Sequence, residues 1–383
     1  MKPISLYIHI PFCERKCPYC DFYSLTGSTD LQRQFVRSLL IEIELISERF
    51  SETPLPVETL FFGGGTPSVL PTDEIEKILR SLHSRFQIAP DAEITIEANP
   101  GAVDQGKFDA YFSMGFNRIS LGIQSFRDDE LLRLGRIHSA SEAEAAIRSA
   151  QMAGFININL DMIFGIPGQT ITQWQENLEK ALYWQPAHLS TYNLIYEANT
   201  PFWRWRESGK IRPLDEQIEW DMYRSTVERL KAEGFDHYEI SNFSLPGNAC
   251  RHNQNYWNGT TYLGFGPSAH SFQGEKRWWN VADVNAYISG LRDKKLPVGG
   301  QEILTPQQQK MEYIFLSLRQ KKGLSLSAYR KKFGREFLEE FAHSIEIIRK
   351  TQEKIGRLLV LENDQLFFTT MGFWLSDSLL EWF

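Results

Sequence analysis

The regular alternation of short β-rich runs with longer amphipathic segments constrains the fold of this chain more than any other feature. Helical patterns lie between the runs, for example over residues 31–50 and over residues 72–86, where Thr72 is the expected N-cap. The alternation predicts a parallel sheet with right-handed crossovers, either a barrel or an open doubly wound sheet. The expected strands are residues 4–10, 58–62, 93–99, 118–124, 158–164 and 188–195.

Residues suited to chemistry cluster at the ends of these strands, which favours a barrel over an open sheet. In barrels of parallel strands, functional side chains gather at the carboxyl ends, where loops from several units converge. The fold class is therefore expected to be α/β, with a partial (β/α)6 TIM-like barrel. The residues concerned are Cys13, the run Gly63-Gly64-Gly65-Thr66-Pro67, Glu97, Asn99, Gln124 and Asp161.

Three of the four cysteines lie within eight residues, which is a poor disulfide framework and is typical of metal ligands. The spacing of Cys13, Cys17 and Cys20 suits three corners of an iron–sulfur cubane and leaves the fourth iron without a protein ligand. A zinc site completed by His9 or Cys250 is the alternative. Cys250 is not expected to bind the cluster.

With its flanking residues, the cysteine segment YIHIPFCERKCPYCDFYS (residues 7–24) resembles the radical SAM superfamily. Within it, nearly the whole chain resembles the group that holds the oxygen-independent coproporphyrinogen III oxidases and the HemW proteins. The resemblance implies a radical SAM barrel, a [4Fe–4S] cluster on the three cysteines and S-adenosylmethionine on the open iron. It also implies contacts with one or the other of two S-adenosylmethionine molecules for Tyr7, Tyr19, Gly64, Gly65, Thr66, Glu97, Gln124, Arg136 and Asp161.

Each of these residues has a physical reason to contact such a ligand. The glycines of the GGGTP run are expected to let the backbone approach the bound methionine with free N–H groups. Carboxylates suit the ribose hydroxyls and the ammonium group, and Arg136 suits a carboxylate.

Two differences from the oxidases and one motif favour the HemW group. The oxidases carry a further cysteine two residues after the third cluster cysteine, where this chain has Asp21-Phe22, and they have an N-terminal extension that is expected to be absent here. Residues 252–257, HNQNYW, match the HNxxYW motif of the HemW group, which implies heme as a ligand. His252 would be the axial donor to iron, with Tyr256 and Trp257 on the macrocycle. Cys250 is a covalent anchor, a thiolate ligand or a buried free thiol.

Three functions remain open at this point. The favoured one is a heme chaperone, a carrier rather than an enzyme, that passes heme to acceptor proteins, membrane respiratory proteins among them. The second is a radical SAM oxidoreductase that decarboxylates coproporphyrinogen III. The third is another radical reaction, which would form 5′-deoxyadenosine with a different substrate.

Charge and hydropathy limit the partners and the location. A net charge of −7 disfavours binding to nucleic acid, which requires a dominant basic surface. The chain has no signal-peptide pattern and no stretch of 18 apolar residues. We therefore expect a cytoplasmic protein without a transmembrane segment. The final segment, residues 371–383, is amphipathic but lacks Lys and Arg. Packing against the barrel is therefore favoured over peripheral membrane contact.

We expect three parts along the chain. Residues 1–235 form the barrel, residues 236–304 close it and carry the HNxxYW motif, and residues 305–383 form a mostly helical domain. The order of three helices and a hairpin in this last part resembles a winged helix. A lid over the barrel is favoured there over a DNA-binding domain.

Overall fold

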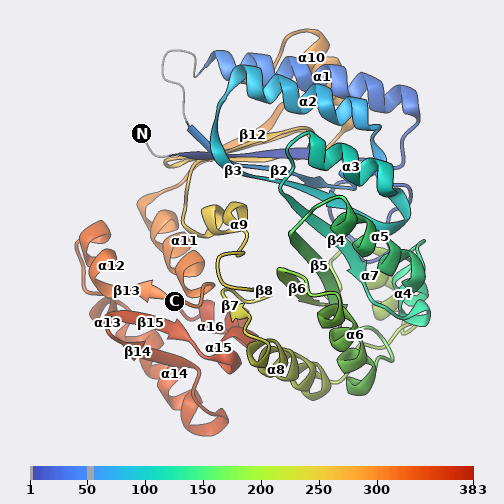
Figure 1. Ribbon diagram of the computed structural model, residues 1–383. Helices are drawn as coiled ribbons and strands as arrows, with labels where there is room; N and C mark the ends of the chain where they lie inside the picture. Colours follow the sequence, from blue (N-terminus) through green and yellow to red (C-terminus); the bar gives the residue numbers. More distant parts are fainter. Residues whose placement is uncertain (1–2, 50–55) are drawn as a thin grey trace.

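The computed structural model describes residues 3–49 and 56–383 and is built on one large sheet (Figure 1). The sheet has 12 strands in the order β12-β11-β10-β9-β1-β2-β3-β4-β5-β6-β8-β7. Its middle contains all six expected strands, paired in parallel, which confirms the α/β class. These strands are β1 (Ile4–Ile10), β2 (Pro56–Gly64), β3 (Gln87–Ala98), β4 (Arg118–Gln124), β5 (Asn157–Phe164) and β6 (His188–Asn193).

The segment expected to close the barrel contributes to both edges of this sheet. At the β1 edge, β9 (Tyr262–Phe265) pairs in parallel, and β10 (His270–Gln273), β11 (Lys276–Asn280) and β12 (Val298–Ile303) follow antiparallel. At the β6 edge, β8 (Asn242–Ser244) and β7 (Asp236–His237) pair antiparallel. The outermost strands, β12 and β7, do not pair with each other in the described chain, so the barrel is partial.

Helices cover the outer face of the parallel strands (Figure 1). The helix expected from residue 31 is α1, which starts two residues earlier; Phe50, the last residue of that expectation, lies outside the described residues. Thr72 is the first residue of α2 and not its N-cap, because Pro71 has the extended backbone (ψ 146°) of that position. The helices here are α1 (Thr29–Glu48), α2 (Thr72–Arg85), α3 (Gln105–Ser113), α4 (Asp128–Leu134), α5 (Ala140–Met152), α6 (Ile171–Tyr183), α7 (Pro201–Glu207), α8 (Glu216–Ala232) and α10 (Val284–Arg292), with 3-10 turns η1 (Pro67–Val69) and η2 (Pro100–Ala102).

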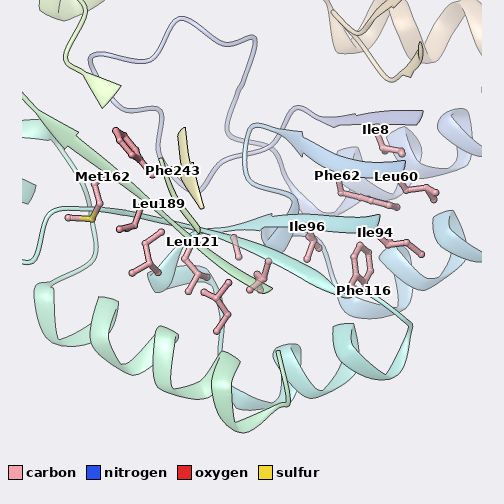
Figure 2. Packing of buried hydrophobic residues seen from close by; sticks show 14 of the residues in the cluster. Ile8, Leu60, Phe62, Ile94, Ile96, Phe116, Leu121, Met162, Leu189 and Phe243 are labelled. Carbon is pink, nitrogen blue, oxygen red and sulfur yellow. The ribbon is translucent and has the colours of Figure 1, made fainter. Parts of the chain in front are cut away.

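The core lies between the parallel strands and these helices (Figure 2). The strands are buried along most of their length, and they carry short polar side chains such as Thr59, Thr95 and Asn159 between the apolar ones. Side chains that the figure labels include Ile8, Leu60, Phe62, Ile96, Phe116, Leu121, Met162 and Leu189, each at most 1% exposed. This packing fixes the strand ends on which the site is built.

The C-terminal part has the expected order of helices followed by a hairpin, with one difference. The helix expected over residues 336–356 is divided at Phe341 (φ −110°, ψ 27°), whose ring packs against Phe337 and Phe383. A three-stranded sheet, β13-β15-β14, completes the winged-helix-like arrangement. The elements are α11 (Pro306–Leu318), β13 (Leu324–Ser325), α12 (Leu326–Phe333), α13 (Phe337–Glu340), α14 (Ala342–Ile355), β14 (Leu359–Glu362), β15 (Gln365–Phe368), α15 (Thr370–Trp374) and α16 (Ser376–Leu380).

The final amphipathic segment packs against the barrel, as expected. The ring of Trp374 lies 6.1 Å from that of Trp220 and 5.5 Å from that of Tyr223, both on α8, and Phe373 contacts His237. The apolar face of the segment is therefore occupied by other parts of the chain. None of the helices in residues 3–49 and 56–383 combines the length and the apolar character needed to cross a bilayer.

Candidate functional site

The three closely spaced cysteines lie on residues 11–28, between β1 and α1, which we call the cysteine loop. Backbone hydrogen bonds hold its base, from Cys13 N to Leu25 O (2.9 Å) and from Leu25 N to Pro11 O (2.8 Å). Cys20 N donates to Cys17 O (3.2 Å), which makes a tight turn between these two thiols. All three thiols are free and partly exposed, as a metal-binding site requires.

Distant elements also hold the cysteine loop. His9 Nε2 donates to Tyr23 O (2.9 Å), and Pro18 O accepts from Phe202 N (3.0 Å) at the start of α7. Tyr23 Oη accepts from Val284 N (2.8 Å) at the start of α10. The barrel strands and two helices thus contribute to the conformation of the cysteine loop.

The thiols and most of the predicted S-adenosylmethionine residues line one cavity of about 400 Å³, which we call the first cavity. Tyr7 is the exception, because its hydroxyl bonds to His9 Nδ1 (3.2 Å) and its side chain lines a neighbouring cavity. The predicted residues that do line the first cavity are Cys13, Cys17, Cys20, Tyr19, Gly64, Gly65, Thr66, Glu97, Gln124, Arg136 and Asp161.

A chain of hydrogen bonds runs from Arg136 to two of the thiols. Arg136 Nη1 donates to Cys17 Sγ (3.5 Å), and Arg136 Nη2 donates to Asn99 Oδ1 (2.7 Å). Asn99 Nδ2 donates in turn to Thr66 Oγ1 (2.8 Å), which donates to Cys13 Sγ (3.5 Å). Donors and a positive charge beside sulfur favour the thiolate, which is the metal-binding form. The sequence placed Asn99 at a strand end but did not predict this linking role.

The glycine run differs from expectation, because its N–H groups are already bonded within the protein. Gly64 N donates to Glu97 Oε2 (3.2 Å), and Gly65 N donates to Ile10 O (2.8 Å). A Cβ on Gly65 would lie 2.7 Å from Phe12 O and 2.8 Å from Ile10 O. Gly65 is therefore needed where the end of β2 passes the cysteine loop, and its N–H is not free for a ligand.

Two carboxylates lie at the floor of the first cavity. Asp161 accepts hydrogen bonds from Ser120 Oγ (2.8 Å) and Asn159 Nδ2 (2.9 Å). Burial, and then the charge of Asp161, raises the pKa of Glu97 to about 8. Because a second negative charge beside Asp161 is unfavourable, Glu97 keeps its proton near neutral pH, and a cationic ligand or one that donates hydrogen bonds would favour the ionised pair.

The donor set of the first cavity fits an iron–sulfur cluster and an amino-acid ligand. Burial is the main cause that raises the pKa of Cys13 and that of Cys20, the latter to about 11, so the thiols are neutral and would lose their protons to a metal. In the described chain, no three His, Cys, Asp or Glu side chains are gathered as a preformed metal site. Gln124 Oε1 and Arg136 Nε are buried on the wall without hydrogen-bond partners in that same part of the chain, so polar atoms remain for a ligand.

The HNxxYW motif forms the short helix α9 (Arg251–Trp257). His252 is 1% exposed and bonded through both ring nitrogens, Nδ1 to Thr59 Oγ1 (2.8 Å) and Nε2 to Tyr256 Oη (2.9 Å). Its ring also stacks on Phe61 at 5.0 Å. Both ring nitrogens of His252 are therefore engaged within the protein.

Other residues fasten α9 to the strands. Glu93 on β3 accepts from Arg251 N (3.1 Å) and His252 N (3.0 Å), which caps the first turn of the helix. Asn255 Nδ2 donates to Ser5 Oγ (2.9 Å) on β1. Cys250 is fully buried, with its thiol 3.6 Å from Glu93 Oε1, and it forms no disulfide.

A second cavity of about 550 Å³ lies beside the first, and the segment Asp21-Phe22 of the cysteine loop borders both. Tyr256 and Trp257 line this second cavity, as expected for residues that pack on a macrocycle, but His252 does not. Phe22 is 64% exposed between the two cavities. His270 also lines the second cavity and was not among the predicted site residues.

Comparisons with known proteins agree with this arrangement. Residues 7–181 match the model of the radical SAM superfamily. Heme chaperone HemW of Synechocystis sp. is 38% identical over 334 residues, 85% of this chain and 80% of that protein. The protein of the same name from Lactococcus lactis is 32% identical, over 100% of this chain and 97% of its own length.

A solved structure extends the fold comparison to the C-terminal part. Coproporphyrinogen III oxidase (HemN) from Escherichia coli, described as a radical SAM enzyme, superposes with a TM-score of 0.86. The superposition covers 99% of this chain and 89% of that one, at 24% sequence identity. At this identity the likeness establishes the fold.

Proposed function

The chain belongs to the HemW family of radical SAM proteins, and on that premise we propose that it is a heme chaperone that holds a [4Fe–4S] cluster and S-adenosylmethionine. The observation that carries the cofactor part is the single cavity that collects Cys13, Cys17 and Cys20 with the polar residues of four strand ends. The relatives that are named heme chaperones support heme as the cargo. We propose that the acceptors of the heme include membrane respiratory proteins and that transfer starts in the cytoplasm.

The residues of the first cavity divide the binding task. Cys13, Cys17 and Cys20 hold the cluster, which supplies an open iron and one electron when bound. Arg136 binds a carboxylate, and its hydrogen bond to Asn99 orients its guanidinium. Glu97 and Asp161 accept hydrogen bonds from ammonium or ribose hydroxyl groups, Gln124 supplies its free oxygen, and Tyr19 and Thr66 complete the wall.

Phe22 supports the chaperone over the decarboxylating oxidase. It occupies the position of the additional oxidase cysteine, and its exposed ring borders both cavities. A phenyl ring can neither donate a proton nor carry a radical as a thiol does. At this position between the two cavities, the chain therefore offers a phenyl ring and no thiol.

In this proposal, residues 305–383 cover the second cavity, where the cargo would bind. Glu312 and Leu316 of α11 line the second cavity. Arg319 Nε donates to the buried Glu239 (3.1 Å), and its guanidinium lies 4.6 Å from the ring of Trp257. A cover held in this way limits the access of water and oxygen to the cofactor.

The test is anaerobic reconstitution followed by heme titration and by assays for 5′-deoxyadenosine and coproporphyrinogen III decarboxylation. We expect stoichiometric heme binding and no decarboxylated product. The Cys13→Ala, Cys17→Ala and Cys20→Ala variants should lose iron and sulfide, whereas the matched control Cys250→Ala should keep both. Release of carbon dioxide by the wild type, or loss of iron from Cys250→Ala alone, would contradict the proposal.

A further inference from the structure

We infer that the heme cargo binds in the second cavity with His270 as the axial ligand to iron, while His252 only braces the cavity wall. This inference rests on the proposed function, because it names the site of the same cargo. The motif and the site then have separate roles.

The second cavity has the size and the walls that a flat macrocycle requires. Its volume of about 550 Å³ falls within the usual range of ligand sites. Aromatic rings from four separate segments line it, namely Phe22, Tyr23, Tyr256, Trp257, Tyr262 and Phe272. Such rings bury a large apolar area with little loss of side-chain freedom.

His270 is exposed at the start of β10, where it lines this cavity. In the part of the chain that the structure describes, its imidazole makes no hydrogen bond, and it stacks on Trp279 with ring centroids 5.6 Å apart and an angle of 27° between the rings. The stacking orients the ring and leaves its nitrogens available. Burial, and then the charge of Arg277, lowers the pKa of His270, which favours the neutral imidazole that binds iron.

The other donors near this cavity are already engaged. His9 is 5% exposed and bonded at both nitrogens, to Tyr7 Oη (3.2 Å) and Tyr23 O (2.9 Å). His252 is bonded in the same way to Thr59 and Tyr256. Cys250 is fully buried against Glu93 and does not line the cavity.

The charges around the second cavity suit the uncharged macrocycle of heme better than they suit its two propionate groups. Arg277 is paired with Glu302 (3.1 Å) and with Glu312, so its charge is compensated. Asp21 adds a further negative charge at the border with the first cavity. The heme propionates would therefore lie on the solvent side, with the macrocycle against the aromatic walls.

The test compares heme titrations of four reconstituted proteins by difference absorption against the heme-free form and by EPR of the ferric state. These are the wild type, His270→Ala, His252→Gln and His83→Ala, the last a matched control because His83 is an exposed histidine on α2. We expect His270→Ala to bind heme at least about tenfold more weakly and to lose the histidine-ligated spectrum. Added imidazole should restore that spectrum, and His270→Cys should give a thiolate-ligated one.

Each result decides a different question. If the wild type binds no heme, the proposed function falls and the inference falls with it. If the wild type binds heme and His270→Ala keeps both its affinity and its spectrum, the proposed function stands and the inference is overturned. Loss of the histidine-ligated spectrum in a folded His252→Gln protein, with His270→Ala unchanged, would also overturn it. An effect of His83→Ala equal to that of His270→Ala would overturn the assignment to this cavity.

Discussion

The polar residues of the first cavity come from neighbouring parallel strands, which carry their side chains to one part of the sheet. Glu97 and Gln124 lie at the carboxyl ends of β3 and β4, and Asp161 lies within the neighbouring strand β5, so the sequence could predict that these side chains share one part of the sheet. The role of His252 was not predictable in this way. It depends on a hydrogen bond to Thr59, 193 residues away in the chain, which sequence patterns do not encode.

Gly65 is the residue at which the smallest change should have a large effect. In Gly65→Ala the new methyl group would meet two backbone oxygens of the cysteine loop and β1, so the loop must move. We expect a loss of about 1–3 kcal/mol in the free energy of unfolding, together with reduced iron content after reconstitution. Urea denaturation and iron analysis measure both.

The control for this change is Gly106→Ala in α3, where the nearest atom to the new methyl group is Asp104 Oδ1 at 3.5 Å. Alanine is favoured over glycine in a helix, so this variant should be up to about 1 kcal/mol more stable. If Gly65→Ala had the same free energy of unfolding as the wild type, the cysteine loop would accommodate the methyl group without loss of stability, and the packing argument would be refuted.

Glu97 should make the stability of the cofactor-free protein depend on pH. The carboxyl group of Glu97 has a pKa of about 8 in the folded chain and an ordinary pKa in the unfolded chain. Between these two pKa values, the folded chain therefore holds the proton of Glu97 more tightly than the unfolded chain does. The free energy of unfolding should therefore decrease as pH rises from about 4.5 to about 8, by at most about 1.4 kcal/mol per pH unit.

Glu97→Gln removes the titrating group, so this component of the slope should disappear in urea denaturations repeated across that pH range. The exposed Glu76→Gln change on α2 serves as the control and should leave the slope unaltered. A slope that is the same in Glu97→Gln and in the wild type would exclude Glu97 as its source.

Among the elements, the long ones were predictable and the short ones were not. The six parallel strands show as short β-rich runs in the sequence, and α1 and α2 show a helical period. The seven residues of α9 form two turns, too few for a period to be recognised. The two-residue strands β7 and β13 exist only because partner strands align them.

The helix α9 depends on Glu93, since both oxygens of this carboxylate accept backbone N–H groups of its first turn. In Glu93→Gln only one oxygen remains, so one buried N–H loses its acceptor. We expect a loss of about 1–3 kcal/mol in the free energy of unfolding, with faster hydrogen exchange at the amides of Arg251 and His252.

The exposed Glu76→Gln variant again provides the comparison, with an expected change within about 0.5 kcal/mol. Unchanged exchange at Arg251 and His252 in the Glu93 variant would mean that the other contacts of α9 suffice to hold it.

In the whole molecule, the C-terminal part joins the barrel through a small number of polar contacts. Glu239 is fully buried, and Arg319 is its cationic partner (3.1 Å). Arg319→Met leaves that carboxylate without a counter-charge and also removes the contact with Trp257. Because Arg319 itself is 28% exposed, we expect a moderate cost of about 2–4 kcal/mol, with faster hydrogen exchange in α11.

Arg330→Met is the matched control, because Arg330 is 62% exposed and pairs with the exposed Glu336 in the same part of the chain. It should change stability by less than about 1 kcal/mol. Equal exchange in α11 for the two variants would show that apolar packing alone attaches this part to the barrel.

The hydrogen bond between Tyr23 and the start of α10 bears on when the cluster can be loaded during synthesis of the chain. The hydrogen bond from Val284 N to Tyr23 Oη joins residues 261 positions apart, so the last of the contacts that hold the cysteine loop forms only after most of the chain has left the ribosome. At ordinary translation speeds this interval is about 10–50 s. During that time the three thiols belong to an unfinished barrel. We therefore expect iron and sulfide to be loaded after translation has passed α10, and a nascent chain stalled before Val284 to remain without its cluster.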